Sequence, residues 1–147
     1  MVRDFNRILA GQKADDLTVA IYESTRSFPK DEVYSLTSQI RRAAYSVPAN
    51  IAEGVSRSSQ KDYLHFLYIA RGSLSEVAYF IHLSHRLKYL DESCHAPLAE
   101  QADEASRVLT GLIRAVEKET SFLPKAIARA MSALVLLFSL KSQVSSL

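Results

Sequence analysis

The sequence of 147 residues has little cysteine, glycine and proline, and it has no tryptophan. Cys94 is the only cysteine, so no disulfide forms within one chain and a reducing compartment suits the protein. The four glycines and four prolines are too few for the many turns of an all-β domain, and long helices are the simpler interpretation.

Long hydrophobic runs are also missing. Residues 133–140 form the most apolar stretch of the tail, which is far shorter than the roughly 20 residues that cross a bilayer. Residues 1–11 contain no apolar stretch of signal-peptide length. We therefore expect a cytoplasmic protein that makes no contact with a membrane. The length fits one domain, and 48% hydrophobic residues suffice to bury a core.

The most specific pattern lies in residues 39–54, QIRRAAYSVPANIAEG. At about 100° per residue, an apolar stripe and a polar stripe run side by side along one predicted helix. The apolar stripe contains Leu36, Ile40, Ala43, Ala44, Val47 and Ile51, and the polar stripe contains Gln39, Arg42, Ser46, Asn50 and Glu53. Pro48 removes the amide donor to the Ala44 carbonyl, which predicts a bend. Gly54 is predicted to end the helix in a left-handed conformation.

The same periodicity predicts three further helices, over residues 14–28, 59–89 and 97–119, with short polar connections that favour antiparallel neighbours. Ser59 and Asp62 form a near capping box, and Pro97 suits a first turn. Gly72 lies inside the third helix, where we expect a close helix–helix approach to offset its cost. We divide the chain into a bundle over residues 1–120 and a tail over residues 121–147, which is either a further helix or a disordered extension.

Three segments together resemble a known family. QIRRAAYSVPANIAEG, preceded by QKADDLTVAIYE and followed by SRSSQKDYLHFLYIARGSLSE, is similar to the four-helix-bundle proteins encoded in intervening sequences of bacterial 23S ribosomal RNA genes. The resemblance covers residues 4–119. The family usually has an aromatic residue, commonly Trp, just before its Gln-Lys-Ala, where this chain has Gly11. The resemblance implies an all-α, up-and-down antiparallel four-helix bundle that assembles into a homo-oligomeric ring, typically a pentamer. It implies no established activity.

The formal net charge of +2 argues only weakly for a nucleic-acid partner, but the charges are unevenly distributed. Residues 39–90 contain seven basic and three acidic side chains, and residues 91–120 contain three basic and seven acidic ones. In a ring, this polarity creates either a basic face and an acidic face or an electrostatic pairing of neighbours. The second interpretation is the more ordinary one for a bundle.

The polar stripe, together with Ser73 and Glu76 of the following helix, is the first candidate site. Antiparallel packing is able to bring Glu76 to Arg42. The favoured interpretation is a structural hydrogen-bond network that determines register and oligomer geometry, buried within one subunit or between two. The alternative is a ligand or RNA contact in a cleft between subunits.

The second candidate is a basic surface formed by Arg41, Arg57, Lys61 and Arg71, with Tyr45 and Tyr63 available for stacking. Positive grooves with aromatic side chains bind single-stranded or looped RNA. The alternative is a solvated helix face. Several copies of a modest patch in a ring strengthen binding through avidity.

Catalytic chemistry finds little support. Glu92 and His95 have the Glu-x-x-His spacing of di-iron bundles, but those proteins need two such motifs, so we expect no metal site and no cofactor. Residues 72–75 lack the second glycine of a nucleophile elbow. The sequence therefore predicts a protein that is not an enzyme. The leading function is RNA or nucleic-acid binding, and the alternative is a structural or protein-interaction scaffold without a nucleic-acid ligand.

Overall fold

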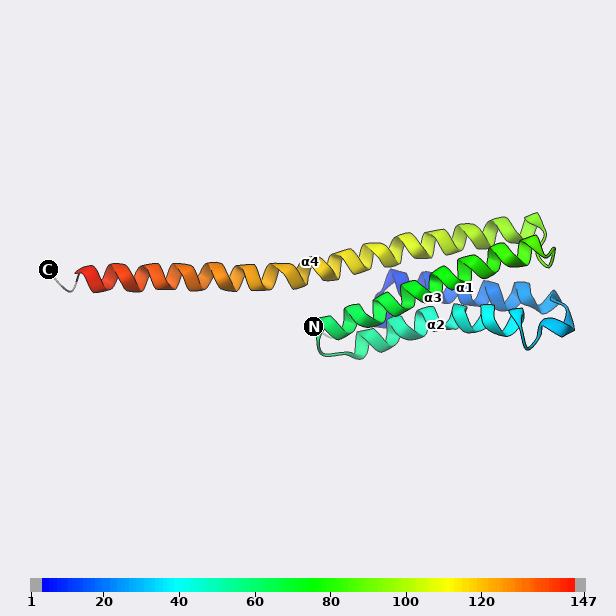
Figure 1. Ribbon diagram of the computed structural model, residues 1–147, viewed down its shortest axis with the longest axis horizontal. Helices are drawn as coiled ribbons and strands as arrows, with labels where there is room; N and C mark the ends of the chain where they lie inside the picture. The colour runs from blue at the N-terminus through cyan, green and yellow to red at the C-terminus, as the bar shows by residue number, and fades with distance from the viewer. Residues whose placement is uncertain (1–3, 145–147) are drawn as a thin grey trace.

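The computed structural model describes the backbone of residues 4–144 and the side chains of residues 4–119 except Asn6. Its four helices are α1 (Leu9–Ser24), α2 (Leu36–Ser56), α3 (Gln60–Arg86) and α4 (Glu92–Val144). Short 3₁₀ turns cover Phe5–Arg7, Thr25–Ser27 and Lys30–Glu32. Successive helices run antiparallel, and α1 packs against both α2 and α4 (Figure 1). The described residues contain no strand, which confirms the predicted all-α four-helix fold.

The core consists of the apolar stripes that the helical periodicity predicts. All six members of the α2 stripe are buried, and Ile40 and Ile51 have no exposed surface at all. The other helices contribute Ala14, Leu17, Ile21, Tyr63, Leu67, Ala70, Leu74, Val77, Ile81, Ala102, Ala105, Leu109, Ile113 and Val116. Leu87 lies within the predicted third helix, but it follows the end of α3 and is 45% exposed.

Phe5 fills the space beside Gly11, which is the position where the chain departs from the family that it resembles. A Cβ atom at this position would lie 2.6 Å from Cε2 of Phe5, so the phenyl ring already occupies that space. Phe5 comes from the 3₁₀ turn before α1 and is half-buried against the core. An aromatic side chain therefore covers the first turns of α1 from upstream in the sequence.

Pro48 lies inside α2 and is buried, and the helix continues past it to Ser56. Because proline has no amide proton, the Ala44 carbonyl has no donor from within its own helix. The Thr18 hydroxyl of α1 lies 3.0 Å from this carbonyl oxygen and 2.8 Å from that of Ala14, so it can donate to either. A neighbouring helix thus supplies the hydrogen bond that the proline removes.

The predictions for two glycines were wrong. No glycine among the described residues has a positive φ, and Gly54 lies two residues before the end of α2 instead of terminating it. Its role is steric, because a Cβ atom there would lie 2.9 Å from Cδ2 of Tyr63 and 3.0 Å from Cβ of Phe66. Gly72 is exposed and has nothing within 4 Å of the position of a Cβ atom, so no close helix approach explains it.

The helix ends are defined by local hydrogen bonds. The Ser59 hydroxyl accepts a hydrogen bond from the Asp62 amide at 3.0 Å, which confirms this residue as the N-cap of α3. Asp91 does the same for α4, because its Oδ1 accepts from the Cys94 amide at 2.9 Å. Helix α4 therefore begins at Glu92, and Pro97 lies beyond the first turn that the sequence analysis assigned to it.

Helix α4 also continues past the predicted end at residue 119. It forms one helix of 53 residues, and its later part extends alone beyond the other three helices (Figure 1). The predicted tail over residues 121–147 thus has a helical backbone as far as Val144. Residues 1–3 and 145–147 lie outside the described part of the chain. Among the described helices, none combines the length and hydropathy of a membrane span.

Candidate nucleic-acid interface

A groove of about 530 Å³ lies where the end of α1, the following connection and the first half of α2 meet. Four of the side chains that line it are cationic: Arg26, Lys30, Arg41 and Arg42. No aspartate or glutamate belongs to its described lining. Glu32, which lies near these residues in sequence, accepts hydrogen bonds from Tyr89 and from the Leu36 amide instead. The groove therefore offers positive charge to a ligand.

Arg41 is the anchored cation of this groove. Its Nε donates to Thr25 Oγ1 at 2.8 Å, and its guanidinium carbon lies 4.9 Å from the centre of the Tyr22 ring. The Thr25 hydroxyl in turn donates to the Ile21 carbonyl at 2.8 Å, in the last turn of α1. A cation beside the carboxyl end of a helix is favourable, because the unpaired carbonyl groups there carry partial negative charge. Arg26, Lys30 and Arg42 are exposed and unconstrained by comparison.

Polar and aromatic groups complete the groove. Tyr22 and Tyr45 line it and are 40% and 49% exposed. Thr37 also lines it, although the residue is only 5% exposed, and its hydroxyl oxygen has no hydrogen-bond partner among the described residues. Buried hydroxyl groups are nearly always paired, so this one is an exception at the base of the groove.

The structure divides the five predicted nucleic-acid-binding residues among separate places. Arg41 and Tyr45 share the groove, whereas Arg57 and Lys61 lie at the turn between α2 and α3. Arg57 follows Arg41 by sixteen residues, which corresponds to about 24 Å along a helix. Arg57 pairs with Glu53 and lies 4.9 Å from the Phe66 ring. Arg71, further along α3, stacks over Tyr68 at 5.0 Å. Sequence reasoning missed Arg26 and Lys30, which precede α2 and reach the groove only because the connection folds back.

The predicted polar network comes together in its centre only. Ser46 Oγ lies 3.0 Å from Ser73 Oγ, and the Asn50 amide nitrogen lies 2.8 Å from the Ser46 carbonyl and 3.0 Å from Ser46 Oγ. These three side chains are half-buried between α2 and α3.

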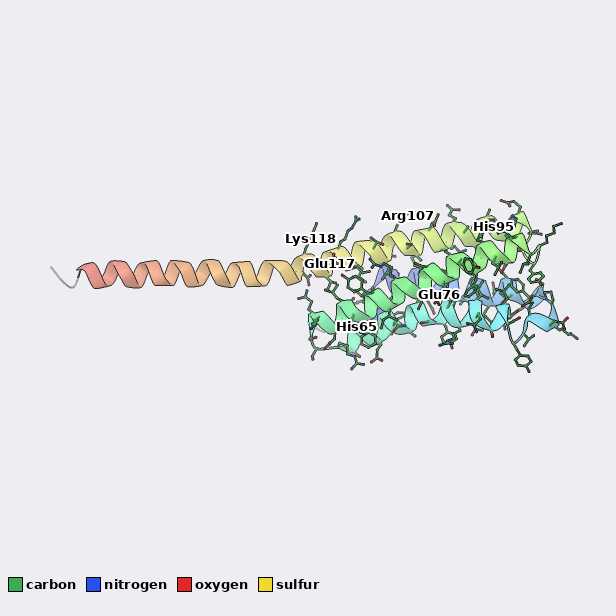
Figure 2. The ribbon with its side chains drawn as sticks, viewed as in Figure 1. His65, Glu76, His95, Arg107, Glu117 and Lys118 are labelled. Carbon is green, nitrogen blue, oxygen red and sulfur yellow. The ribbon has the colours of Figure 1, made fainter. Side chains whose placement is uncertain are left out.

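The outer members of the network lie in solvent. Gln39, Arg42 and Glu76 are exposed, and their side chains make no hydrogen bond or ion pair with the described residues. Glu76 lies midway along α3, as Figure 2 shows. Glu53 is exposed as well and pairs with Arg57 instead of joining the network. The stripe is thus a short hydrogen-bonded centre with solvated ends.

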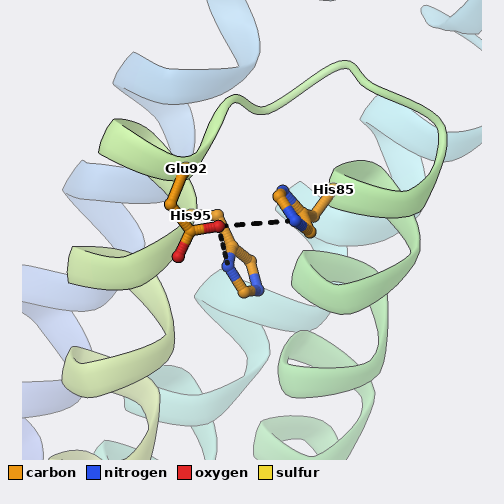
Figure 3. A group of neighbouring side chains, drawn as sticks. All are labelled: His85, Glu92 and His95. Atoms are coloured by element: carbon orange, nitrogen blue, oxygen red, sulfur yellow. Dashed lines mark ion pairs between the residues drawn. The ribbon is translucent and has the colours of Figure 1, made fainter.

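A third cluster was not expected to form. Glu92 and His95 lie on the first turns of α4, and His85 of α3 joins them across the connecting turn (Figure 3). The sequence analysis placed Glu92 beside a loop because it started the helix at Pro97. Asp91 was the missed signal, since an aspartate before Glu92 is a good N-cap and predicts a helix that includes both residues.

The fold and the α1–α2 groove define a class, a four-helix bundle with a basic groove. Residues 7–111 match the model of the family described as 23S rRNA-intervening sequence protein, and the chain belongs to this family. No curated protein matches the chain.

A solved structure supports the same fold. It is the crystal structure of a protein of unknown function from the S23 ribosomal protein family of Bacteroides thetaiotaomicron. The two chains are 23% identical, with a TM-score of 0.66, and the similarity covers 71% of this chain and 98% of that one. The family assignment and the fold are therefore established, and neither specifies a ligand.

Proposed function

We propose that this protein is a non-enzymatic RNA-binding protein of the cytoplasm and that the α1–α2 groove holds the RNA. The groove supports the proposal, because four cations and two half-exposed tyrosines line it and its described lining contains no acidic side chain. Phosphate groups pair with arginine and lysine, and unstacked bases pack on tyrosine rings. We infer single-stranded or looped RNA as the ligand, since bases in a duplex are not free to stack on protein side chains.

We further propose that the chain forms a homo-oligomeric ring, a pentamer by resemblance to the family. A second surface of opposite charge supports such an assembly. The groove between α1 and α4 is lined by Asp16, Glu23 and Glu104, with Lys13 as its one cation among the described lining residues. Head-to-tail rings require two different, complementary surfaces on each subunit. A ring would also present several basic grooves to one RNA and raise the affinity by avidity.

The test of RNA binding is the light-scattering mass of the protein alone and with structured and single-stranded RNAs, at low and physiological salt. We expect the mass to rise with single-stranded or looped RNA, and the affinity to fall steeply as salt increases. For single strands the slope of log K against log salt is about −0.7 per phosphate contact. A mass that no RNA changes at either salt concentration would exclude the RNA-binding function.

Matched variants locate the surface. Lys30→Gln with Arg42→Gln removes two groove cations, and we expect the salt slope to become shallower by about 1.4. Arg107→Gln with Arg114→Gln removes the same charge from exposed positions on α4, where Figure 2 labels Arg107. This control should leave the slope unchanged. Lys61→Gln with Arg71→Gln tests the surface at α3 that the sequence analysis had included. Equal losses in all three pairs would show nonspecific charge attraction instead of a groove.

Tyr45→Ala separates base stacking from charge. We expect weaker binding by about 1–3 kcal/mol per stacked base, with an unchanged salt slope. Tyr34→Ala is the matched control, because Tyr34 is 94% exposed and lies outside the groove lining. If both changes have the same effect, stacking in the groove is not part of binding.

The second candidate function is a protein-interaction scaffold. The two oppositely charged grooves favour it equally well if the basic groove of one subunit binds the acidic surface of the next. In that case Lys30→Gln with Arg42→Gln lowers the mass of the assembly in the absence of RNA, because the basic groove holds the next subunit. An assembly that keeps its mass in these variants and loses RNA supports the first candidate.

A further inference from the structure

Three side chains with metal-binding atoms meet at the turn between α3 and α4 (Figure 3). His85 lies in the last turn of α3, Glu92 opens α4, and His95 follows one turn later. Oε2 of Glu92 lies 3.5 Å from Nε2 of His85 and 3.8 Å from Nδ1 of His95. One ligand atom from each residue lies within 4.8 Å of the other two.

The backbone of the turn holds these residues in place. Lys88 has a φ of 62°, the left-handed conformation that reverses the chain after α3. The Tyr89 amide then donates to the Ser84 carbonyl at 2.9 Å, and Asp91 caps α4. The three ligand atoms thus come from the ends of two long helices instead of from a loop, which favours a reproducible geometry.

Each imidazole has a nitrogen available for a ligand. Nδ1 of His85 lies 3.2 Å from the Leu90 carbonyl oxygen, so it carries the proton and donates, and the Nε2 lone pair remains free. Nδ1 of His95 is buried and has no hydrogen-bond partner among the described residues. A buried nitrogen without a partner is rare in native structures, and this one lies beside Glu92 and His85.

We propose that His85, Glu92 and His95 bind a divalent transition-metal cation of the zinc type. Two imidazoles and one carboxylate are a donor set that zinc uses, with bonds of roughly 2.0–2.2 Å. Tetrahedral bonds of this length place ligand atoms about 3.3 Å apart, which is close to the two observed separations. Because imidazole lone pairs lie in the ring planes and the two rings now stack, one ring rotates about its side-chain bonds when both nitrogens coordinate an ion beside the Glu92 oxygen.

The exposure of the cluster allows the ion to enter and leaves a coordination position open. The side chains of His85, His95 and Glu92 are 37%, 23% and 76% exposed, so the carboxylate is able to withdraw into solvent while it remains a ligand. The fourth position faces water, which completes the coordination. A bound ion would join the end of α3 to the start of α4 and stabilise the folded chain, because the unfolded chain does not hold the three ligands together.

An ion pair between Glu92 and protonated histidines is the competing interpretation. Such a pair explains the distances, and the two rings stack with their centres 4.1 Å apart and their planes 18° from parallel. It does not require a metal, and at the observed separation of 3.8 Å it gives the buried Nδ1 of His95 no hydrogen bond. The two interpretations therefore differ in one measurable property, which is the affinity for a transition metal at neutral pH.

The experiment uses the full chain without a histidine tag, titrated with Zn²⁺ by calorimetry and with Co²⁺ by visible absorption. We expect one ion per chain and the intense d–d bands of four-coordinate Co²⁺, without the thiolate bands that Cys94 ligation would add. The melting temperature should rise with metal concentration. Glu92→Gln, His85→Ala and His95→Ala should each weaken binding more than about tenfold, since even outer-shell changes cost 10–100-fold.

Two variants serve as controls. His65→Ala removes an exposed imidazole at the opposite end of α3, as Figure 2 shows, and Cys94→Ser removes the nearby thiol. Both should bind as tightly as the parent chain. Equal weakening by either control, or parent affinity retained by the double variant His85→Ala with His95→Ala, overturns the proposal. Glu92→Gln keeps the test valid if a histidine variant misfolds, because Glu92 is largely exposed.

Discussion

The two faces of α2 differ in how firmly the rest of the molecule determines each side chain. On the core face, the apolar stripe is buried, Gly54 lies against Tyr63 and Phe66, and the Thr18 hydroxyl reaches the Ala44 carbonyl that Pro48 leaves without a donor. On the polar face, Ser46 and Asn50 form hydrogen bonds with Ser73 or within their own turn, Glu53 pairs with Arg57, and Gln39 and Arg42 lie in solvent. The core face is therefore fixed by packing along its length, whereas the polar face is held by α3 at its centre only.

The largest contrast should come from truncating one residue on each face. Ile51→Ala removes a side chain with no exposed surface, and we expect a loss of about 2–5 kcal/mol in the free energy of unfolding. Arg42→Ala should change it by less than about 0.5 kcal/mol, because the residue is exposed. Urea unfolding followed by circular dichroism measures both. A large loss in Arg42→Ala would mean that this arginine is paired and buried in the assembled protein.

Gly54 and Gly72 provide the next comparison, since the same substitution meets opposite surroundings. Gly54→Ala forces a methyl group against Tyr63 and Phe66, and overpacking of this kind costs about 1–3 kcal/mol. Gly72→Ala adds a methyl group where there is open space, and alanine stabilises a helix interior by up to about 1 kcal/mol. Thermal unfolding of the two variants should move in opposite directions. A stabilised Gly54→Ala variant would contradict the close approach of α2 and α3.

The hydrogen bond from Thr18 to the Ala44 carbonyl should have a smaller effect. Thr18→Val leaves that carbonyl without a donor, and we expect a loss of about 1–2 kcal/mol in the free energy of unfolding. Pro48→Ala restores an amide proton within α2, so the same Thr18 substitution should cost less in that background. A double-mutant cycle by urea unfolding measures this coupling. Costs that add without coupling would show that Thr18 does not compensate for the proline.

The smallest effect on stability should come from Glu32, which lies just before the start of α2. Hydrogen bonds from the Ser35 hydroxyl, the Leu36 amide and the Tyr89 hydroxyl lower the pKa of Glu32 below its ordinary value of 4.5. Because the pKa is lower in the folded chain, this stabilisation is present above pH 4.5 and disappears as the pH falls through the lowered value. Glu32→Gln should flatten the acid side of the stability profile, and Tyr89→Phe should raise the pKa of Glu32. An unchanged carboxyl titration by NMR in Tyr89→Phe would contradict the contact.

Sequence reasoning succeeded where the signal is local. The stripe from Leu36 to Ile51 predicted both the helix and its buried face, since a period of 3.6 residues places those side chains on one side of any regular helix. It failed for Gly54, because glycine is common at helix ends and only the position of Tyr63 shows that the residue is needed for space. The start of α4 was also predicted wrongly. Proline is common in the first turn of a helix, so Pro97 was assigned there, whereas the helix begins after its cap at Asp91.

The candidate sites were less predictable than the fold. Arg41 and Tyr45 were expected at a basic surface, and the structure places them together, but their neighbours Arg26 and Lys30 come from a connection whose path has no periodic signal. Arg57 and Arg71 are also cationic but lie away from the groove, because each residue of a helix advances the chain by about 1.5 Å along the axis. The sequence therefore identified two members of the groove, Arg41 and Tyr45, and missed the cations that the connection brings to it.

The amino-acid sequence by itself determined that this chain is helical, antiparallel and a member of its family, because helix periodicity, caps and motif spacing are properties of neighbouring residues. Only the tertiary structure decided which side chains meet across helices. Thr18 reaches Ala44, four cations surround one groove, and His85 joins Glu92 and His95, and each of these contacts depends on how turns reverse the chain and on how closely helices pack. Those distances follow from the summed packing of the whole bundle, which no local pattern encodes.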